Sequence, residues 1–365
     1  MENFIVSARK YRPVDFEAVV GQQAITSTLE NAIEKDQLPS ALLFCGPRGV
    51  GKTTCARILA KKINQKHSTA ETIEDPDFAF NIFELDAASN NSVDDIRNLI
   101  DQVRFSPQSG KYKVYIIDEV HMLSKAAFNA FLKTLEEPPP HAIFILATTE
   151  KHKIIPTILS RCQIYDFKRI TTTDICNHLE FIAQKEGVSY QKEALYLIAQ
   201  KADGALRDAL SIYDRMVSFT LGNLDLEKVS LNLNILDYDY YLSCCDHVLK
   251  SNLAEALLLF DGVLDKGFDG HLFVNGLSEH FRNLIVAKDP KTIGLLEMAD
   301  TTKEKYQKQA ESTTFPLLFQ GLEICNKADV DYKNSKNKRL TVEIALMQLC
   351  SIETSSQEDK KKSLA

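Results

Sequence analysis

The stretch that decides the fold of this chain is Phe44-Cys45-Gly46-Pro47-Arg48-Gly49-Val50-Gly51-Lys52-Thr53-Thr54. Within it, Gly46, four residues and then Gly51-Lys52-Thr53 match G-x-x-x-x-G-K-[ST], a pattern whose backbone amides cradle phosphate at the positive end of a helix. The apolar run 41–45 before it has strand character, and apolar residues recur at helical spacing after it. We therefore expect a phosphate-binding loop in which Lys52 reaches the β/γ-phosphates and Thr53 holds Mg²⁺. The alternative is a Gly-rich turn with a chance lysine.

Composition places the chain among globular proteins and excludes several classes. Its 365 residues allow two or three domains, and 44% hydrophobic with 25% charged residues is ordinary for such proteins. No apolar stretch approaches the roughly 18 residues of a membrane span, and Met1-Glu2-Asn3-Phe4 does not begin a signal peptide. We expect a cytoplasmic protein without a membrane partner. A net charge of −7 confines any DNA contact to one local face.

Strand and helix patterns alternate in the first half of the chain. We expect strands at 41–45, 81–86, 113–119, 142–149 and 161–167. A helical pattern at 24–35 precedes the first strand, and others lie between strands at 55–63, 92–103 and 125–137. Ser92 is the expected N-cap of its helix. The polar stretch 64–77 has no periodicity and is expected to form a loop. Alternation of this kind predicts a parallel five-stranded sheet covered on both faces.

From residue 171 onward the patterns are helical, with no convincing buried strand. Patterns at 173–185, 191–203 and 205–219 predict a small cluster, and a second helical block spans 237–353. Its last helix is apolar almost all round, as in a helix packed among others or across a subunit interface. The final polar residues, 354–365, are expected to be disordered.

Asp118-Glu119 ends a buried strand and supplies the second half of a nucleotide site. With the phosphate loop beside it, Asp118 can order Mg²⁺ through water and Glu119 can polarise the attacking water. Three further candidates each have an alternative interpretation without a catalytic role. Thr148-Thr149 either orients the attacking water or forms an ordinary turn. Arg161 and Arg207 either stabilise phosphate charge or form surface ion pairs.

Taken together, the motifs resemble those of one family. In chain order they are Ala8-Arg9-Lys10-Tyr11-Arg12-Pro13, Gly46–Thr54, Glu84–Asn91, Ile117–Leu123, Leu132–Pro139, Ala147-Thr148-Thr149, Ser160-Arg161-Cys162 and Leu206-Arg207-Asp208-Ala209. Over residues 4–355 the sequence closely resembles the gamma/tau subunits of bacterial DNA polymerase III, the ATPases of the sliding-clamp loader. The resemblance implies an α/β AAA+ P-loop domain over 1–170, a small helical lid over 171–235 and an all-α collar over 236–353.

The same resemblance implies roles for individual residues. Residues bordering the adenine would be Tyr11, Arg12, Pro13, Val19 and Val20, and the phosphate loop would be Gly46, Pro47, Arg48, Gly49, Val50, Gly51, Lys52, Thr53 and Thr54. Thr149 would be sensor 1, Arg207 sensor 2, and Arg161 an arginine finger inserted into the adjacent subunit's site. Candidate DNA-facing residues are Asn90, Ser92, Arg97 and Arg104, with a plain solvated helix as the alternative.

The implied activity is that of an ATP-driven motor with no polymerase site of its own. ATP and Mg²⁺ are the implied cofactors. Implied partners are delta and delta-prime subunits, the β sliding clamp, primed DNA and other copies of the chain in a five-subunit ring. Two other interpretations remain open. One is a scaffold subunit that shares the fold but only assembles partners; the presence of Glu119 and Arg161 argues against it, because a scaffold needs neither. The other is a different AAA+ motor, such as a branch-migration helicase.

Two features depart from the family pattern. Members usually carry four zinc-binding cysteines after the phosphate-loop helix, but none of the eight cysteines lies between Cys55 and Cys162. We therefore expect no zinc, because His67 with Glu71, Asp75 and Asp77 lacks the thiolates of structural zinc sites. Tau-type chains also continue into segments that bind the helicase and the polymerase. This sequence is gamma-like in length, as a truncated tau would also be.

Overall fold

The computed structural model describes residues 5–66, 81–107, 110–233, 235–296, 298 and 300–362. The chain separates into two compact units. The first comprises Met1–Phe181 with Ala199–Arg215, and the second comprises Ile182–Ile198 with Met216–Ala365. The three domains expected from the sequence have other boundaries and stay a prediction.

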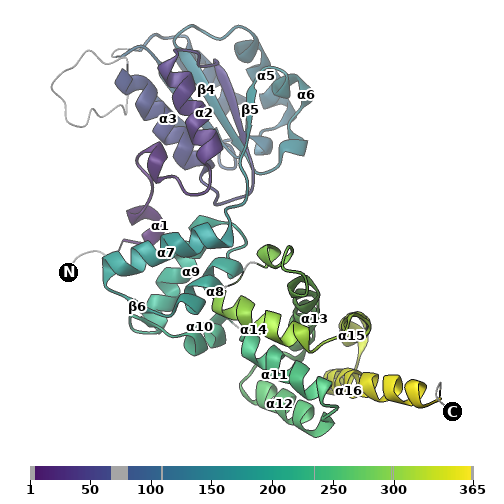
Figure 1. The fold of residues 1–365 in the computed structure, drawn as a ribbon. Coiled ribbons are helices and arrows are strands. Elements are labelled where there is room, and N and C mark those ends of the chain that lie inside the picture. The colour runs from purple at the N-terminus through teal and green to yellow at the C-terminus, as the bar shows by residue number, and fades with distance from the viewer. Residues whose placement is uncertain are drawn as a thin grey trace. The chain divides into compact units, whose positions relative to one another are not determined.

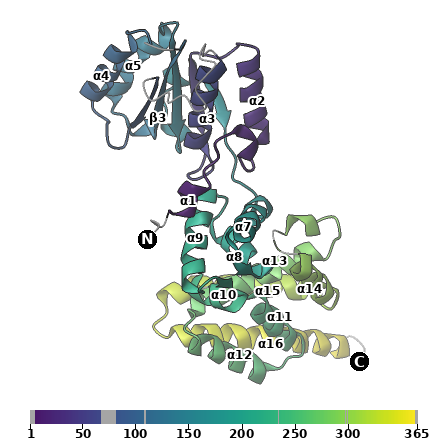
Figure 2. The ribbon, with the colours of Figure 1, turned by 90° about the vertical axis from the view of Figure 1, so that its left-hand side faces the viewer.

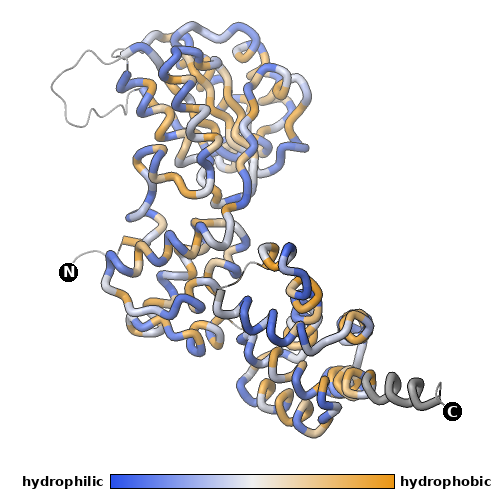
Figure 3. Tube along the Cα trace, in the orientation of Figure 1, coloured by the Kyte–Doolittle hydropathy of each residue, from blue (hydrophilic) through white to orange (hydrophobic). Residues whose placement is uncertain are grey.

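The first unit is built on a five-stranded sheet of order β2-β3-β4-β1-β5 in which every pair is parallel. Its strands are β1 (Ala41–Cys45), β2 (Ile82–Asp86), β3 (Lys113–Asp118), β4 (Ala142–Thr148) and β5 (Gln163–Asp166). Both β1 and β4 are buried along their whole length, as their continuous apolar sequences predict for a sheet covered on both faces. Figure 3 shows this hydrophobic centre in orange. The predicted parallel five-stranded sheet is confirmed.

Helices cover the two faces of this sheet. Their bounds are α1 (Ser7–Lys10), η1 (Phe16–Ala18), α2 (Gln23–Glu34), α3 (Lys52–Lys66), α4 (Val93–Val103), η3 (Val120–Met122), α5 (Lys125–Glu136), η4 (Lys151–Lys153) and α6 (Pro156–Leu159). Figures 1 and 2 show α2 and α3 on one side and α4 and α5 on the other. Alternate residues of a strand point to opposite faces of the sheet and pack into two separate hydrophobic cores. Phe44 packs with α2 and α3 in one core, and Phe144 packs with α4 and α5 in the other.

Local sequence determines where these helices begin and end. Ser92 caps α4 as predicted, because its hydroxyl accepts a hydrogen bond from the Asp95 amide. The Asp95 carboxylate accepts one from the Ser92 amide, which completes a capping box. The loop expected from residue 64 begins later, because α3 continues to Lys66. The buried Asn64 amide donates to the Ala60 carbonyl, and Lys66 Nζ donates to the Ile33 carbonyl across 2.5 Å. Residues 67–80, with the proposed loop and its His67, lie outside the described part.

After β5 the structure is almost wholly helical. The remaining helices are α7 (Thr172–Glu186), α8 (Lys192–Lys201), α9 (Leu206–Phe219), α10 (Leu226–Leu233), α11 (Tyr238–Leu249), α12 (Leu253–Asp265), α13 (Gly270–Ala287), η5 (Ile293–Leu295), α14 (Asp300–Glu311), α15 (Phe315–Asn334) and α16 (Lys338–Lys362). Sequence patterns miss one feature, a two-residue parallel pair of β6 (Ser189–Tyr190) with β7 (Asn223–Leu224). These strands are too short to show a period.

Helices α11–α16 of the second unit share one core around α13. Phe273 and Phe281 of α13 are fully buried in it. Close helix approach requires glycine: a Cβ on Gly276 would lie 2.0 Å from Tyr241 Oη, and one on Gly321 would lie 3.0 Å from the Phe281 ring. The predicted all-helical C-terminal block is confirmed.

Helix α16 bears on two expectations from the sequence. Leu346 and Leu349 are buried, but Ile344 and Met347 keep 44% and 41% of their surface exposed, so the apolar circumference is not fully covered within this unit. Helix α16 extends to Lys362, and the disorder expected over 354–365 stays a prediction. These residues contain good helix formers, Glu, Gln and Lys, and no Gly or Pro to stop the helix. Among the described residues, no helix is long and apolar enough to span a membrane.

Candidate nucleotide site

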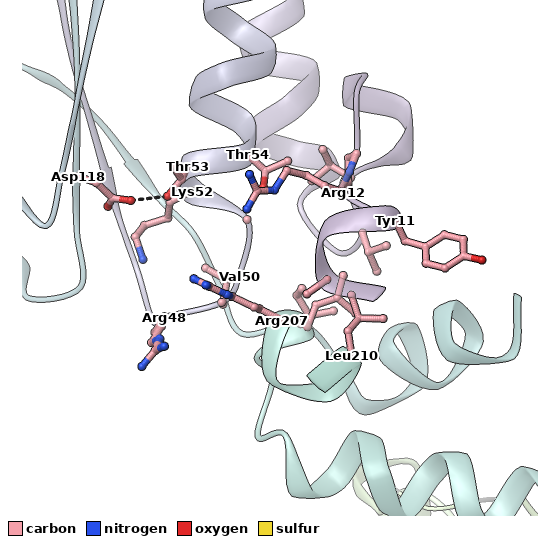
Figure 4. Close-up of a pocket in the computed structure, with 18 of the residues that line it drawn as sticks. Tyr11, Arg12, Arg48, Val50, Lys52, Thr53, Thr54, Asp118, Arg207 and Leu210 are labelled. Carbon is pink, nitrogen blue, oxygen red and sulfur yellow. Dashed lines mark hydrogen bonds between the residues drawn. The ribbon is translucent and has the colours of Figure 1, made fainter. Parts of the chain in front are cut away.

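A cavity of about 170 Å³ opens where the phosphate loop, the end of β3 and the start of α9 meet in the first unit. Most residues predicted to bind nucleotide line it. From the N-terminal arm these are Tyr11, Arg12, Pro13, Val19 and Val20, from the loop Arg48, Gly49, Val50, Gly51, Lys52, Thr53 and Thr54, and from elsewhere Asp118, Glu119 and Arg207. Segments up to about 200 residues apart in sequence thus converge on one space (Figure 4).

Two glycines give the loop its shape. Gly46 lies so close to the chain after β5 that a Cβ would be 2.5 Å from the Phe167 carbonyl oxygen. Gly49 has a φ of 77°, which L side chains rarely adopt, and its carbonyl accepts a 3.4 Å hydrogen bond from the Arg207 amide. The loop conformation is therefore fixed both from the sheet and from α9.

Lys52 is almost fully buried at the start of α3. Its Nζ donates to the carbonyls of Gly46 and Pro47, at 2.8 and 2.7 Å. Burial lowers the pKa of Lys52, and the carboxylates of Glu119 and Asp118 partly oppose that effect. A buried cation beside the loop amides suits a polyphosphate. The negative charge of the phosphates would compensate the ammonium for the hydration that burial removes.

Thr53 and Asp118 form the second part of the site. Thr53 Oγ1 donates to Asp118 Oδ2 across 2.6 Å, and Asp118 Oδ1 accepts from the Glu119 amide at 2.9 Å. A hydroxyl and a carboxylate are the hard oxygen ligands that Mg²⁺ prefers beside phosphate. The donor set therefore fits that ion.

Glu119 has an unusual backbone for a non-glycine residue. Its φ of 48° and ψ of 42° place it in the left-handed region, where residues at functional sites often lie. This ends β3 one residue before the predicted strand end. Thr149 Oγ1 donates to Glu119 Oε2 across 3.0 Å, although Thr149 is not among the residues lining the cavity. Because β3 and β4 are neighbours in the sheet, this hydrogen bond joins their carboxyl ends.

Positive charge gathers on the remaining wall. Figure 4 shows the Arg207 side chain extending from α9 to the loop beside Val50, and Arg12 pointing towards Thr54. Burial lowers the pKa of Arg12, and the neighbouring Arg57 and Arg207 lower it further. Tyr11 differs from the others, because its ring points away from the other labelled side chains in Figure 4. Tyr11 still contributes to the lining of the cavity, and its place beside an adenine stays a prediction.

Sequence reasoning missed four lining residues, Ala8, Ile170, Leu206 and Leu210. They are apolar, and although Ala8 and Leu206 stand inside quoted motifs, none of the four was given a role. Their position on the wall follows from tertiary contacts: the Ser7 amide donates to Asp214 of α9 at 2.8 Å, and the Ile170 amide donates to the Gly204 carbonyl at 3.1 Å. These contacts join the N-terminal arm and α9 around the site.

Arg161 lies outside this cavity. Its guanidinium donates to Glu136 Oε1 at 2.6 Å and to the Thr157 carbonyl at 2.7 Å. The structure therefore does not bring it to the chain's own nucleotide site. Whether it serves another subunit's site stays a prediction.

The four candidate DNA-facing residues also lie away from the cavity. Ser92 serves as the α4 N-cap, and Asn90 Nδ2 donates to the Asp86 carbonyl at 3.1 Å. Arg97 and Arg104 are 66% and 74% exposed, and each pairs with an aspartate one helical turn earlier. Their charges are thus partly balanced within α4, and a DNA contact there stays a prediction.

In the described ranges, no group of three or more His, Cys, Asp or Glu side chains is placed to hold a metal ion. All eight cysteines are free, and burial raises the pKa of Cys55 to about 12. The candidate ligands Glu71, Asp75 and Asp77 lie outside these ranges, as His67 does.

Comparison with known proteins gives consistent matches along the chain. Residues 21–171 match a family described as DNA polymerase III, delta subunit. Residues 174–222 match the ATPase lid domain of the DNA polymerase III clamp loader subunit, and residues 224–364 match domain III of DNA polymerase III subunits gamma and tau.

Individual relatives agree with these matches. DNA polymerase III subunit gamma of Buchnera aphidicola subsp. Baizongia pistaciae is 35% identical, with 96% of this chain and 98% of that protein covered. Subunit tau of Bacillus subtilis is 40% identical over 96% of this chain, which spans 64% of its length. A solved structure of the Thermotoga maritima RuvB Holliday junction branch migration motor is 22% identical, and the match covers 66% of this chain and 78% of that one. Its TM-score is 0.49, so this similarity is too distant to bear on function. The chain belongs to the gamma/tau family of DNA polymerase III clamp-loader subunits.

Proposed function

We propose that this chain is the ATP-hydrolysing motor subunit of a clamp loader, which opens the β sliding clamp and loads it onto primed DNA. The observation that carries the proposal is the convergence of phosphate-loop residues 48–54, Asp118 and Glu119 on one cavity, with Thr149 bonded to Glu119. A pure scaffold needs none of these groups, so the geometry favours the motor over that alternative.

ATP binding uses the positive wall and the loop. Lys52 turns its ammonium from the loop carbonyls towards the β/γ-phosphates, and loop amides donate to the same oxygens. Arg207 reaches the phosphates from α9. The base lies against the N-terminal arm at Pro13, Val19 and Val20, which supply apolar contact.

Hydrolysis uses the carboxylates at the end of β3. Thr53 and Asp118 would hold Mg²⁺, which would supply charge neutralisation at the phosphates. Glu119 accepts a proton from the attacking water, and Thr149 holds its carboxylate in place through the 3.0 Å hydrogen bond. A carboxylate fixed in this way has less orientational freedom to lose in the transition state.

Arg161 acts in trans in this proposal. The guanidinium is about one-third exposed at the surface and held by the carboxylate of Glu136. Exchange of that carboxylate for the γ-phosphate of an adjacent subunit's ATP would add charge stabilisation to a site that lacks an arginine finger of its own.

Assembly with other subunits is the remaining part of the proposal. The exposed apolar side chains of Phe315, Phe319, Ile344 and Met347 on α15 and α16 support a ring formed through the C-terminal helices. Copies of this chain with delta and delta-prime subunits would form a ring of five that holds the β clamp and primed DNA.

Steady-state ATP turnover in the reconstituted complex tests the proposal. The motor requires turnover that is stimulated by clamp and primed DNA together and abolished by Lys52→Ala. Turnover that ignores clamp and DNA would favour a different AAA+ motor. Full clamp-loading activity by Lys52→Ala would favour the scaffold.

A further inference from the structure

His121 lies between two carboxylates beside the nucleotide site. Its side chain is only 6% exposed; Nδ1 lies 3.4 Å from Glu119 Oε2, and Nε2 lies 3.3 Å from Glu150 Oε1. Nδ1 also lies 3.1 Å from Thr148 Oγ1. Both ring nitrogens therefore face oxygen atoms, and one of these oxygens belongs to the proposed catalytic carboxylate.

The far side of the histidine is anchored. Glu150 accepts from Lys153 Nζ at 2.7 Å, a contact that lowers the pKa of that carboxyl and keeps it charged. The Glu150 amide donates to Thr148 Oγ1 at 3.0 Å, which fixes the hydroxyl that Nδ1 contacts. Thr148 is fully buried at the end of β4. The ring is thus held from the β4 side independently of Glu119.

The contacts on Glu119 come from two directions. Thr149 Oγ1 and His121 Nδ1 both approach Oε2 of this carboxylate, at 3.0 and 3.4 Å. The Glu119 side chain is still 31% exposed and its backbone is left-handed, so packing alone does not determine its rotamer. Polar contacts have to orient it.

We propose that His121 is a positioning residue, which holds the Glu119 carboxylate in the orientation that activates water for ATP hydrolysis. This inference rests on the proposed ATPase function. His121 is not among the residues that line the cavity; it acts through Glu119, with Thr148 and Glu150 as its supports.

Substitutions at His121 separate this role from simple packing. An asparagine amide can take the place of Nδ1, and a glutamine amide the place of Nε2, whereas alanine removes both. We expect the kcat for ATP in the reconstituted complex to fall about tenfold in His121→Ala, because Glu119 loses the polar contact with Nδ1 that supports its orientation. Asparagine restores most of it and glutamine restores less, because only the former reaches Glu119.

His152→Ala is the matched control. This histidine also contacts Glu150, with Nε2 3.5 Å from Oε2, but its side chain is 76% exposed and points to solvent. We expect wild-type turnover from it. Binding of a fluorescent ATP analogue and the melting temperature are measured for every variant, and both should stay near wild type in His121→Ala.

A double substitution tests whether His121 acts through Glu119. In a Glu119→Gln background, His121→Ala should cause no further loss of the residual turnover, because residues that act through one group are not additive. Additive losses would overturn the proposal.

The remaining outcomes are distinguishable. Wild-type turnover by His121→Ala overturns the positioning role and leaves the proposed ATPase intact. Loss of nucleotide binding or of thermal stability in step with turnover assigns His121 to packing and also overturns it. A wild-type complex that binds ATP without hydrolysing it refutes the proposed function, and the positioning role falls with it.

Discussion

Thr53 at the start of α3 donates a 2.6 Å hydrogen bond to Asp118 at the end of β3. The bond joins the loop half and the acidic half of the proposed site through the two groups expected to hold Mg²⁺. Thr53→Val removes the hydroxyl at nearly constant volume. We expect Mg²⁺ to lose most of its effect on ATP binding, with affinity in Mg²⁺ about tenfold weaker.

Titration of a fluorescent ATP analogue with Mg²⁺ or with EDTA measures this loss. Thr28→Val is the control, because Thr28 is an exposed helical threonine on α2 that bonds only to the Ala24 carbonyl in the contacts seen here. Equal Mg²⁺ dependence in Thr53→Val and wild type would exclude Thr53 as a ligand.

The Thr149–Glu119 hydrogen bond should affect turnover rather than binding. Thr149→Val removes a hydrogen bond to a charged group, which is worth about 1.5–3 kcal/mol and corresponds to a kcat about 10- to 100-fold lower. Thr157→Val, at an exposed position of α6, should turn over normally. The account is contradicted if Thr149→Val weakens nucleotide affinity while kcat is unchanged.

The ion pair of Arg161 with Glu136 should contribute little stability. Both side chains are substantially exposed, at 32% and 49%, and exposed pairs are worth less than about 1 kcal/mol. Glu136→Gln should therefore leave the denaturant midpoint nearly unchanged and should not reduce ATP turnover. A large loss of turnover in this variant with retained stability would show that the carboxylate itself is required.

Phe144 tests the core beneath the site. It is fully buried on β4, with its ring centroid 5.2 Å from that of Phe131 and 5.6 Å from that of Tyr115. Phe144→Ala should reduce the free energy of unfolding by about 3–5 kcal/mol, since the cavity is lined by rigid neighbours. Phe105→Ala, at a residue 70% exposed, should change it by less than about 0.5 kcal/mol. Denaturant unfolding that does not separate the two variants would contradict the packing described.

His280 makes stability depend on pH in the second unit. Burial lowers its pKa to about 4, although the hydrogen bond to Gln309 Oε1 opposes that effect. The unfolded histidine titrates near 6.5 and so binds more protons between pH 6.5 and 4. Stability is therefore fully present above pH 6.5 and is lost as the pH falls towards 4, by on the order of 3 kcal/mol.

The measurement is the pH slope of unfolding for the full chain. Neighbours of His280 are Tyr306 Oη and Gln309 Oε1, each 2.9 Å from a ring nitrogen, together with the ring of Tyr241. His280→Gln should flatten the slope between pH 6.5 and 4, whatever its effect on stability at pH 7. A slope equal to that of wild type would assign the acid sensitivity to other groups.

Sequence patterns predicted the parts of the molecule whose signals are local. The phosphate loop, the buried strands and the Ser92 cap each depend on residues within a few positions of one another, so their spacing is sufficient. The carboxyl ends of β3 and β4 also had to meet in a parallel sheet, which made the approach of Thr149 to Glu119 predictable in outline.

Features that depend on tertiary contacts could not be predicted. Nothing in the sequence near Arg161 points to Glu136, which is 25 residues away, and the direction of the Tyr11 ring depends on how the arm packs. His121 belongs to the motif 117–123, but the sequence assigned it no role, because its partner Glu150 follows a different strand, β4. Its signal was only its position, two residues after Glu119.

ATP turnover by the reconstituted complex with and without Arg161→Ala tests the central claim most directly. The account predicts hydrolysis that needs clamp and primed DNA together and that falls about 10³-fold or more in the variant, with ATP binding retained. Turnover that persists without Arg161, or that is indifferent to the clamp, would contradict a motor whose sites are shared between subunits.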